Sequence, residues 1–301
     1  MGREEYETLT VRVQEGVAFV AIDHPPLNLF DGPLIADLDR FNTAVRADDA
    51  VRVVVFESAD PEFFLGHGDM RLVSDPAAMR EFIAGPGPAL FQRYRSLAQV
   101  TIAKVTGRAR GSGNEFLLTL DMRFAASGQA WFGQPEVSLG ILPGGGGTQH
   151  LPRLVGRSRA LEIILGSDLV DAETAQRYGL VNRSIPADEL DGFVDRLALR
   201  IASYPWSAVA AAKKAVEAAA LPFADGLTAE GELLWPLFTS PVAVGRFTDA
   251  LAAGAQTHDG ELDLEGLIGR ELQPVACDAT PATGSLGARS PRRDNDAGTE
   301  P

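Results

Sequence analysis

The sequence predicts an α/β fold with a helical C-terminal region, and two patterns support this fold class. Between about residues 7 and 200, short apolar stretches alternate with segments whose apolar residues recur at helical spacing. After residue 200 only the helical spacing continues. We therefore expect an α/β core over 1–200, a helical region over 201–272 and a tail over 273–301.

Apolar periodicity predicts the first elements. Alternating apolar residues before and after Gly16 indicate a β-hairpin, residues 31–48 a helix and residues 51–58 a short buried strand. Residues 76–98 have helical character, which the Gly-Pro-Gly-Pro stretch at 85–88 is expected to interrupt.

The alternation continues in the central part and then gives way to helices. Further strands are expected over 101–107 and 122–127, and further helices over 114–121, 207–220, 229–238 and 242–254. The last stretch, 273–301, has almost no bulky apolar residues, which is typical of a disordered tail.

Charge and composition limit the partners. The net charge of −14 argues against nucleic acid and anionic membrane surfaces, because the long-range field repels phosphates. It leaves open an anionic small molecule, which needs only a few local cations. The sequence has no apolar run long enough to span a membrane and no signal-peptide pattern at its start, so we expect a cytoplasmic protein.

Several kinds of catalytic site find no support in the sequence. The single cysteine, Cys277, lies in a polar stretch with nothing that suggests a thiol nucleophile. The four histidines lack the spacing of a zinc site, and no G-x-S-x-G nucleophile motif is present. We therefore expect no metal.

Two glutamates in apolar surroundings are the candidate acid–base groups. Glu115 follows a glycine turn and enters an apolar helix, and Glu136 lies between apolar segments behind Pro135. Burial without a cation raises a carboxyl pKa toward neutrality, as general acid–base catalysis requires. The alternative is structural: each glutamate caps a helix or pairs with an arginine such as Arg108, Arg110 or Arg123.

The segments around these glutamates, taken in order, resemble the enoyl-CoA hydratase/isomerase (crotonase) family. The resemblance extends over roughly residues 8–255 and is carried by the segments 22–38, 51–70, 102–126, 132–156 and 167–190. It implies a crotonase-like spiral of ββα units with a C-terminal helical subdomain.

The resemblance also implies roles for single residues. The thioester carbonyl of an acyl-CoA would be held by the backbone N–H groups of Gly68 and Ser112, which form an oxyanion hole. Glu115 and Glu136 fall on the two glutamates of the hydratases. Glu115 would help to activate a water molecule and Glu136 would deliver or remove the proton at the α-carbon, although the two could share these tasks.

The first oxyanion loop departs from the family pattern. In "FFLGHGDM", His67 replaces a glycine, and it could act as an acid or base, shape the pocket, or point away from it. Ser112 replaces a glycine of the second turn, which matters only if the turn needs a positive φ there. His67, Asp69, Met70 and Trp131 are expected to line the substrate pocket.

The C-terminal region departs as well. Related enzymes often end in a basic helix near the CoA phosphates, whereas here only Arg246 and Arg270 are cationic between residues 245 and 272. The resemblance implies trimers, often paired into hexamers, with the C-terminal helices covering a neighbour's site. The apolar residues of 233–238 could serve that interface or belong to an ordinary core.

Four consecutive glycines, Gly144 to Gly147, lack the lysine and the spacing of a phosphate-binding loop. In the resemblance, the N–H of Gly144 donates to the catalytic water, and the other glycines keep side chains away from the acyl group. We therefore expect a bulky residue at Gly144 to lower turnover more than CoA affinity.

The leading interpretation is reversible hydration of a 2-enoyl-CoA thioester, with coenzyme A as part of the substrate and no other cofactor. The alternatives are double-bond isomerisation, another reaction of the crotonase type, or a catalytically weak protein of this fold that serves as an assembly partner. The pair of glutamates argues against the last of these, because buried carboxylates without a function are costly.

Overall fold

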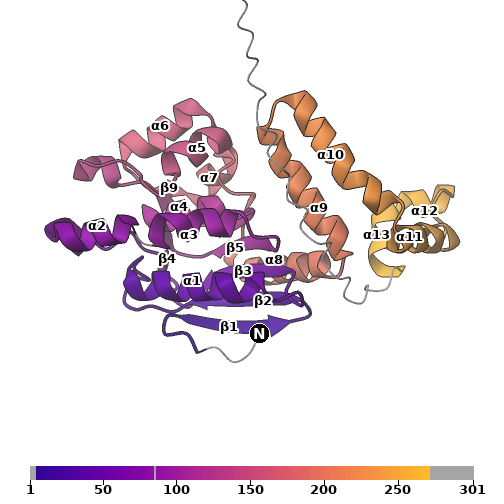
Figure 1. Cartoon of the computed structure of the whole chain (residues 1–301), viewed down its shortest axis with the longest axis horizontal. Helices are drawn as coiled ribbons and strands as arrows, with labels where there is room; N and C mark the ends of the chain where they lie inside the picture. The colour runs from indigo at the N-terminus through magenta and orange to yellow at the C-terminus, as the bar shows by residue number, and fades with distance from the viewer. Residues whose placement is uncertain (1–4, 85, 272–301) are drawn as a thin grey trace, which may run out of the picture.

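A six-stranded sheet is the centre of the computed structural model, which describes residues 5–84 and 86–271 (Figure 1). Its strands are β1 (Leu9–Gln14), β2 (Val17–Ile22), β3 (Val53–Ser58), β5 (Val100–Val105), β7 (Met122–Ala126) and β10 (Arg183–Ile185), in the order β1-β2-β3-β5-β7-β10. Only β1 and β2 are antiparallel, and they form the expected hairpin. The strands expected over 51–58, 101–107 and 122–127 are confirmed.

Helices cover both faces of this sheet, because successive side chains of a strand point to opposite sides. Along β2, Ala18, Val20 and Ile22 join the core beneath α1, whereas Val17 and Phe19 join the core beneath α8. The helices of this part are α1 (Gly32–Arg46), α2 (Pro76–Ala84), α3 (Pro86–Arg95), α4 (Ser112–Thr119), α5 (Gly147–Val155), α6 (Arg157–Gly166), α7 (Ala172–Tyr178) and α8 (Ala187–Ala202). Three short 3₁₀ helices complete the list: η1 (Met70–Ser74), η2 (Glu136–Leu139) and η3 (Ala218–Ala220).

The expected break at 85–88 is wrong in extent. The helix α2 ends at Ala84, and α3 already begins at Pro86. Proline is tolerated in the first turn of a helix, where its missing N–H has no intrahelical partner. Residues 86–88 therefore start a helix rather than interrupting one.

A second, smaller sheet carries much of the candidate site. Its strands are β4 (Phe63–Leu65), β6 (Arg108–Arg110), β8 (Trp131–Gly133) and β9 (Val170–Asp171), in this order. Gly107 precedes β6 with a φ of +70°, and a Cβ there would lie 2.3 Å from the backbone of Glu62. Only glycine allows this approach, which brings β6 alongside β4.

Within the described residues, five α-helices follow the core: α9 (Trp206–Glu217), α10 (Phe223–Phe238), α11 (Pro241–Ala252), α12 (His258–Leu262) and α13 (Leu264–Glu271). The expected helices over 207–220, 229–238 and 242–254 are confirmed, although α10 starts earlier than expected. These helices extend to one side of the core (Figure 1). No helix in the described ranges is long and apolar enough to cross a membrane. The expected tail over 273–301, with Cys277, lies outside the described residues.

Candidate active site

Glu115 lies in the first turn of α4 and is bound by the glycine run. The side chain is only 2% exposed, and its Oε1 accepts hydrogen bonds from the N–H groups of Gly145 and Gly147, both at 2.8 Å. Burial raises the pKa of Glu115, and the two backbone hydrogen bonds partly oppose that rise. The two hydrogen bonds thus fix the position of the carboxyl group, while burial keeps its pKa above the ordinary value.

Glu136 begins η2 and lacks such partners. It is 9% exposed, and its Oε2 has no hydrogen-bond partner among the described residues. Burial, together with the charge of Glu115, raises the pKa of Glu136 to about 7. No salt bridge within the described ranges joins either glutamate to an arginine, so the structural alternative of an ion pair finds no support.

Gly68 and Ser112, the expected oxyanion donors, lie next to each other. Gly68 forms an isolated bridge with Phe30, and Ser112 is the first residue of α4. A Cβ at Gly68 would lie 3.3 Å from Ser112 Oγ. In the described ranges neither N–H group donates to a protein acceptor, and the first N–H groups of a helix carry partial positive charge. The two N–H groups can therefore both donate hydrogen bonds to an oxygen atom that carries negative charge.

The turn between β6 and α4 joins these donors to the glutamates. Gly111 has a φ of +51°, and a Cβ there would lie 2.9 Å from Glu136 Oε1. A Cβ at Gly113 would lie 2.2 Å from the carbonyl oxygen of Leu65 at the end of β4. Both glycines are thus needed for the close packing that brings Gly68, Ser112 and Glu136 together, and Ser112 itself needs no positive φ.

The glycine run touches the site at positions other than the expected one. Gly144 is exposed, and a Cβ there would meet nothing within 4 Å. A Cβ at Gly145 would lie 2.3 Å from Phe91 Cε2, and one at Gly147 would lie 2.3 Å from Gln134 Nε2. Crowding of a Cβ therefore occurs at the glycines that bind Glu115 and not at Gly144. The contact of the Gly144 N–H with water stays a prediction.

Gln134 and Phe91 were not anticipated from the sequence. Gln134 is fully buried, and neither of its amide atoms has a partner among the described residues. Phe91 packs in the core against Phe30, with ring centroids 5.3 Å apart. Both side chains pack against the glycine run that binds Glu115, and they therefore help to fix the position of this run.

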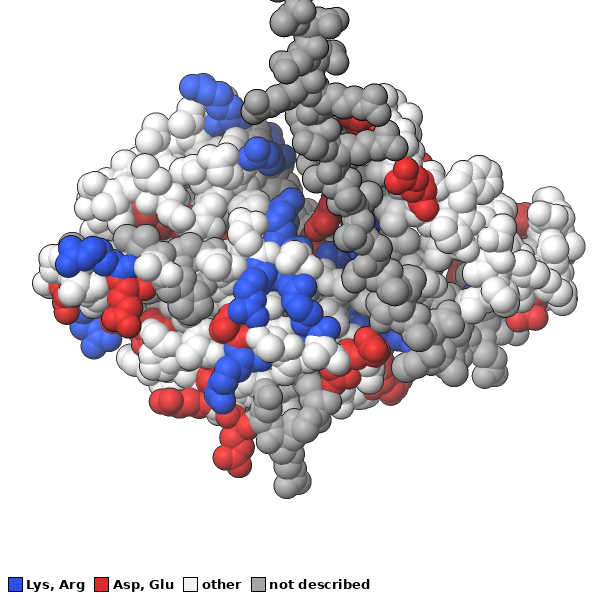
Figure 2. Space-filling model, viewed as in Figure 1, with Lys and Arg blue, Asp and Glu red and all other residues white. Residues whose placement is uncertain are grey.

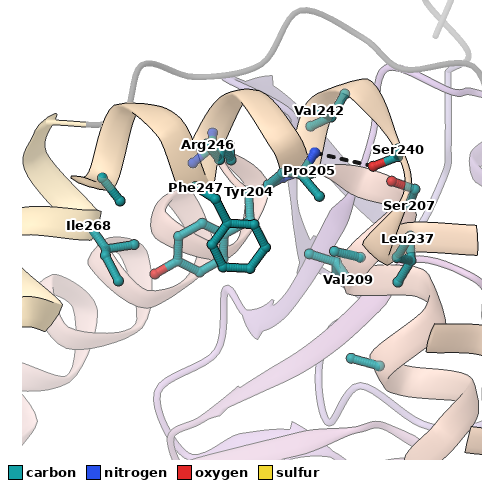
Figure 3. A pocket seen from close by; sticks show the side chains of 14 residues that line it. Tyr204, Pro205, Ser207, Val209, Leu237, Ser240, Val242, Arg246, Phe247 and Ile268 are labelled. Carbon is teal, nitrogen blue, oxygen red and sulfur yellow. Dashed lines mark hydrogen bonds between the residues drawn. The ribbon is translucent and has the colours of Figure 1, made fainter. Parts of the chain in front are cut away.

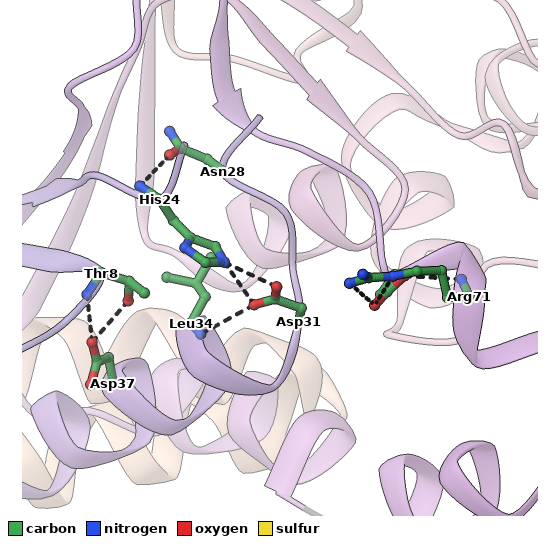
Figure 4. A network of polar contacts seen from close by, with 8 residues as sticks. Thr8, His24, Asn28, Asp31, Leu34, Asp37 and Arg71 are labelled. Atoms are coloured by element: carbon green, nitrogen blue, oxygen red, sulfur yellow. Dashed lines mark hydrogen bonds and ion pairs between the residues drawn. The ribbon is translucent and has the colours of Figure 1, made fainter. Parts of the chain in front are cut away.

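Asn28 is a further residue that the sequence analysis missed. Its Oδ1 accepts from the N–H of His24 at 2.8 Å (Figure 4), and its Nδ2 donates to the carbonyl of Phe63 at 3.1 Å. Its own carbonyl accepts from the N–H of Gly66 at 2.8 Å. Asn28 has a φ of +50°, which asparagine adopts more readily than most residues. It fixes the loop that ends in the donor Gly68.

The ring of His67 contacts the backbone of the neighbouring oxyanion residue. Its Nδ1 donates to the carbonyl of Gly68 at 2.9 Å, since a carbonyl can only accept. The side chain lines a small cavity together with Arg108 and Arg110. This geometry favours the reading in which His67 shapes a pocket.

The other expected pocket residues lie at the edge of the site. Asp69 accepts hydrogen bonds from the Arg71 side chain at 2.6–3.0 Å, and Met70 is 48% exposed. Trp131 is half-buried on β8, in register with Arg108 of β6. No hydrogen bond in the described ranges joins any of these three to Glu115 or Glu136, so their place in the pocket stays a prediction.

A larger, apolar cavity of about 470 Å³ lies elsewhere, between α9, α11 and α13 (Figure 3). Tyr204, Val209, Phe247 and Ile268 line it, and none of its lining residues is acidic.

The described residues contain no group of three or more histidine, cysteine or acidic side chains that could hold a metal ion. The candidate active site is instead marked by Glu115 and Glu136, which are both buried and both have raised pKa values.

Comparison with known proteins gives consistent matches. A sequence profile described as enoyl-CoA hydratase/isomerase matches residues 12–241. A crotonyl-CoA hydratase of Syntrophomonas wolfei is 37% identical over 213 residues, which cover 70% of this chain and 81% of that protein. A short-chain-enoyl-CoA hydratase of Clostridium acetobutylicum is 33% identical and covers 70% and 82%. An enoyl-CoA hydratase structure from Bacillus anthracis has a TM-score of 0.76 at 27% identity and covers 82% and 95%.

Proposed function

Because the chain belongs to the enoyl-CoA hydratase/isomerase family, we propose that it is a lyase that reversibly hydrates a 2-enoyl-CoA thioester to a 3-hydroxyacyl-CoA. The likeness to solved hydratases confirms the crotonase-like α/β fold. The observation that carries the proposal is the pair of buried glutamates with raised pKa values: backbone N–H groups of the glycine run donate to Glu115, whereas the Oε2 of Glu136 has no partner among the described residues.

The geometry supports a division of labour. The substrate carbonyl oxygen accepts from the N–H groups of Gly68 and Ser112, which stabilise the enolate formed when water attacks the β-carbon. Glu115, held by Gly145 and Gly147, takes a proton from that water. Glu136, whose pKa is raised to about 7, carries a proton near neutral pH and delivers it to the α-carbon.

No step needs a metal or a redox cofactor, because the thioester carbonyl accepts the electron pair. The reverse reaction uses the same groups with the protons exchanged. Glu136 then removes the α-proton, and Glu115 protonates the leaving hydroxyl group. A single proton, carried by Glu136 before hydration and by Glu115 after it, is therefore enough for both hydration and dehydration.

Loss of the conjugated enoyl-thioester absorbance tests the proposal with short, medium and long 2-enoyl-CoA substrates. Glu115→Gln and Glu136→Gln should each lower kcat by roughly 10²- to 10⁴-fold, the range for loss of a general acid or base. Glu189→Gln on α8 is the matched control, because Glu189 is exposed to solvent. Full activity in both active-site variants would overturn the mechanism.

Product analysis in the same assay separates the alternatives. A shifted double bond without a hydroxyl product would identify an isomerase. No turnover at any chain length, together with tight binding to another protein, would favour an assembly partner.

We also propose a homotrimer or a dimer of trimers. No residue of α10 is buried, and Leu234, Trp235 and Phe238 are 45%, 69% and 56% exposed. Leu233 and Leu237 are half-buried. Large exposed apolar surfaces mark association sites, so this part of α10 fits an interface better than a core.

Light scattering of the full chain should give the mass of three or six copies, and Trp235→Glu should lower it. A monomer that is fully active would contradict the assembly. The cytoplasmic location and the domain boundaries at 200 and 272 stay predictions.

A further inference from the structure

Two polar side chains close the loop that connects β2 to α1. His24 lies near the start of this loop and Asp31 at its end, and Nε2 of His24 donates to both carboxylate oxygens of Asp31 at 3.0 Å (Figure 4). The main chain of His24 is held as well, because its N–H donates to Oδ1 of Asn28 and its carbonyl accepts from the N–H of Asn28, both at 2.8 Å. These contacts fix the two ends of the loop relative to each other.

The closed loop in turn holds the oxyanion loop. The N–H of Phe30 donates to the carbonyl of His67 at 3.1 Å, and the carbonyl of Asn28 accepts from the N–H of Gly66 at 2.8 Å. Phe30 also forms the bridge with Gly68. The oxyanion loop is thus bound, up to and including its proposed donor, to the loop that the histidine–aspartate pair closes.

The His24–Asp31 pair is shielded from solvent. The two side chains are only 21% and 15% exposed. On the visible face of the molecule, acidic and basic side chains lie beside one another at several places (Figure 2), where water and salt screen their interaction. Asp31 has a second role, because its Oδ1 also accepts from the N–H of Leu34 and so caps α1. The pair therefore ties the loop to the fixed end of a helix.

Gly68 depends on such contacts because it has no side chain that could hold it in place. On its C-terminal side, Asp69 caps η1 by accepting from the N–H of Arg71 at 2.9 Å. An N–H group stabilises a developing oxyanion only from about 2.7–3.1 Å, so a displacement of about 1 Å is enough to weaken it. The loop between β2 and α1 supplies the contacts on the N-terminal side of Gly68.

We propose that His24 and Asp31 are positioning residues, which hold the N–H of Gly68 at the distance and angle that the thioester carbonyl oxygen requires. This inference rests on the proposed function, in which Gly68 donates to that oxygen. The two side chains act on the backbone rather than on the substrate. Their effect passes through Asn28 and Phe30 to the oxyanion loop.

The absorbance of a bound chromophoric thioester tests the proposal. The probe is dimethylaminocinnamoyl-CoA, whose extended conjugation disfavours hydration. Hydrogen bonds to its carbonyl oxygen stabilise the charge-separated excited state and shift the absorbance maximum to longer wavelength. The wild type should show this red shift, and His24→Ala and Asp31→Ser should retain about half of it or less. Serine at position 31 still caps α1 but is too short to reach His24.

Steady-state hydration of a 2-enoyl-CoA gives the second readout. Both variants should lower kcat about tenfold, less than the roughly 10²- to 10³-fold loss when a whole oxyanion donor is removed, and KM should change less than about threefold. His24→Gln should recover most of the red shift and of kcat, because the glutamine amide donates to Asp31 from nearly the position of Nε2.

Two control variants separate positioning from general stability. His258 and Asp259 form the same kind of pair at 3.2 Å, but they are 87% and 99% exposed on α12, so His258→Ala should behave like the wild type. Asp37 lies on α1 as well, but it contacts Thr8 and Arg40. Asp37→Asn should therefore lower stability without changing the red shift.

The outcomes distinguish this inference from the proposed function. A wild-type red shift that His24→Ala and Asp31→Ser leave unchanged would overturn the inference, even if the wild type hydrates enoyl-CoA. A wild type that binds the probe without a red shift would overturn it as well. A red shift that depends on the pair, without hydration of any 2-enoyl-CoA, would leave the positioning role standing and remove the proposed function. The double variant should lose no more than either single variant, and additive losses would contradict a joint role.

Discussion

Asp37 and Glu136 are both buried carboxyl groups, and the molecule treats them in opposite ways. Asp37 accepts from the N–H and the hydroxyl of Thr8 at 2.7 and 2.9 Å and pairs with Arg40. Burial raises the pKa of Asp37, but these partners outweigh burial and the net shift is downward. Glu136 has an unpaired Oε2, and its pKa rises to about 7.

This difference separates a structural group from a catalytic one. A carboxylate with all its partners stabilises the fold at neutral pH. A buried carboxylate without hydrogen-bond partners destabilises the fold when it is charged, but it can exchange a proton near neutral pH. The comparison predicts that buried polar groups with partners stabilise the fold, and that the unpartnered carboxyl group of Glu136 serves the reaction.

The largest effect on stability is expected at Asn28, a fully partnered buried amide. Asn28→Ala leaves the backbone groups of Phe63 and His24 without their partner and should lower the free energy of unfolding by about 3 kcal/mol. It should also lower kcat, because the loop that ends in Gly68 loses its anchor. Denaturant unfolding and initial rates measure the two effects.

Asn42 is the matched control for Asn28, since it is fully buried and neither amide atom has a partner in the described ranges. Asn42→Leu should be close to neutral for stability and for kcat. Equal losses at Asn28 and Asn42 would break the distinction between partnered and unpartnered groups.

Next in size is the glycine run. Gly147→Ala forces a Cβ to within 2.3 Å of Gln134 Nε2 and 3.0 Å of Glu115 Oε1. Displacement of Glu115 should lower kcat/KM about 100-fold, the effect of a misplacement of about 1 Å. Gly144→Ala should stay within about twofold, because its Cβ meets open space. Steady-state kinetics that rank the two variants the other way would restore Gly144 as the sensitive position.

The smallest effect is a pH-dependent change in stability. The folded-state pKa of Glu136 is about 7, above its ordinary value of 4.5, so its contribution to stability is present below pH 4.5 and is lost as the pH rises through 7. Glu136→Gln should therefore be more stable than the wild type at pH 8 and equal to it below pH 4.5. Thermal unfolding across this range measures the difference.

Asp37→Asn should behave in the opposite way. Its folded-state pKa lies below the ordinary 3.8, so its contribution to stability is present above that value and is lost as the pH falls. The variant should be less stable than the wild type at pH 7, and the difference should shrink below about pH 4. Parallel pH profiles for the two variants would contradict the assigned roles.

The central sheet was readable from the sequence because β2, β3, β5 and β7 are continuous apolar strands. The smaller sheet was not anticipated. Its strands are only two or three residues long, too short for a period to appear, and their partners are distant in the sequence. Close backbone approaches at Gly107 and Gly113 hold this sheet together, and a sequence alone does not show what a glycine touches.

The candidate site was partly readable as well. Acidic residues in apolar surroundings pointed to Glu115 and Glu136, but the choice of Gly145 and Gly147 as donors depends on the path of one turn. No sequence motif or apolar period indicated that Asn28 anchors the loop before Gly68.

The pH dependence of kcat/KM for hydration tests the central claim most directly. The account predicts a bell-shaped profile whose alkaline limb lies near pH 7, because the glutamate pair reacts with one proton and loses it as the pH rises through the pKa of Glu136. Hydration has no net proton change, so dehydration of the 3-hydroxyacyl-CoA must show the same limb. A kcat/KM that stays constant from about pH 5 to 9 in both directions would contradict a mechanism in which Glu115 and Glu136 share one catalytic proton.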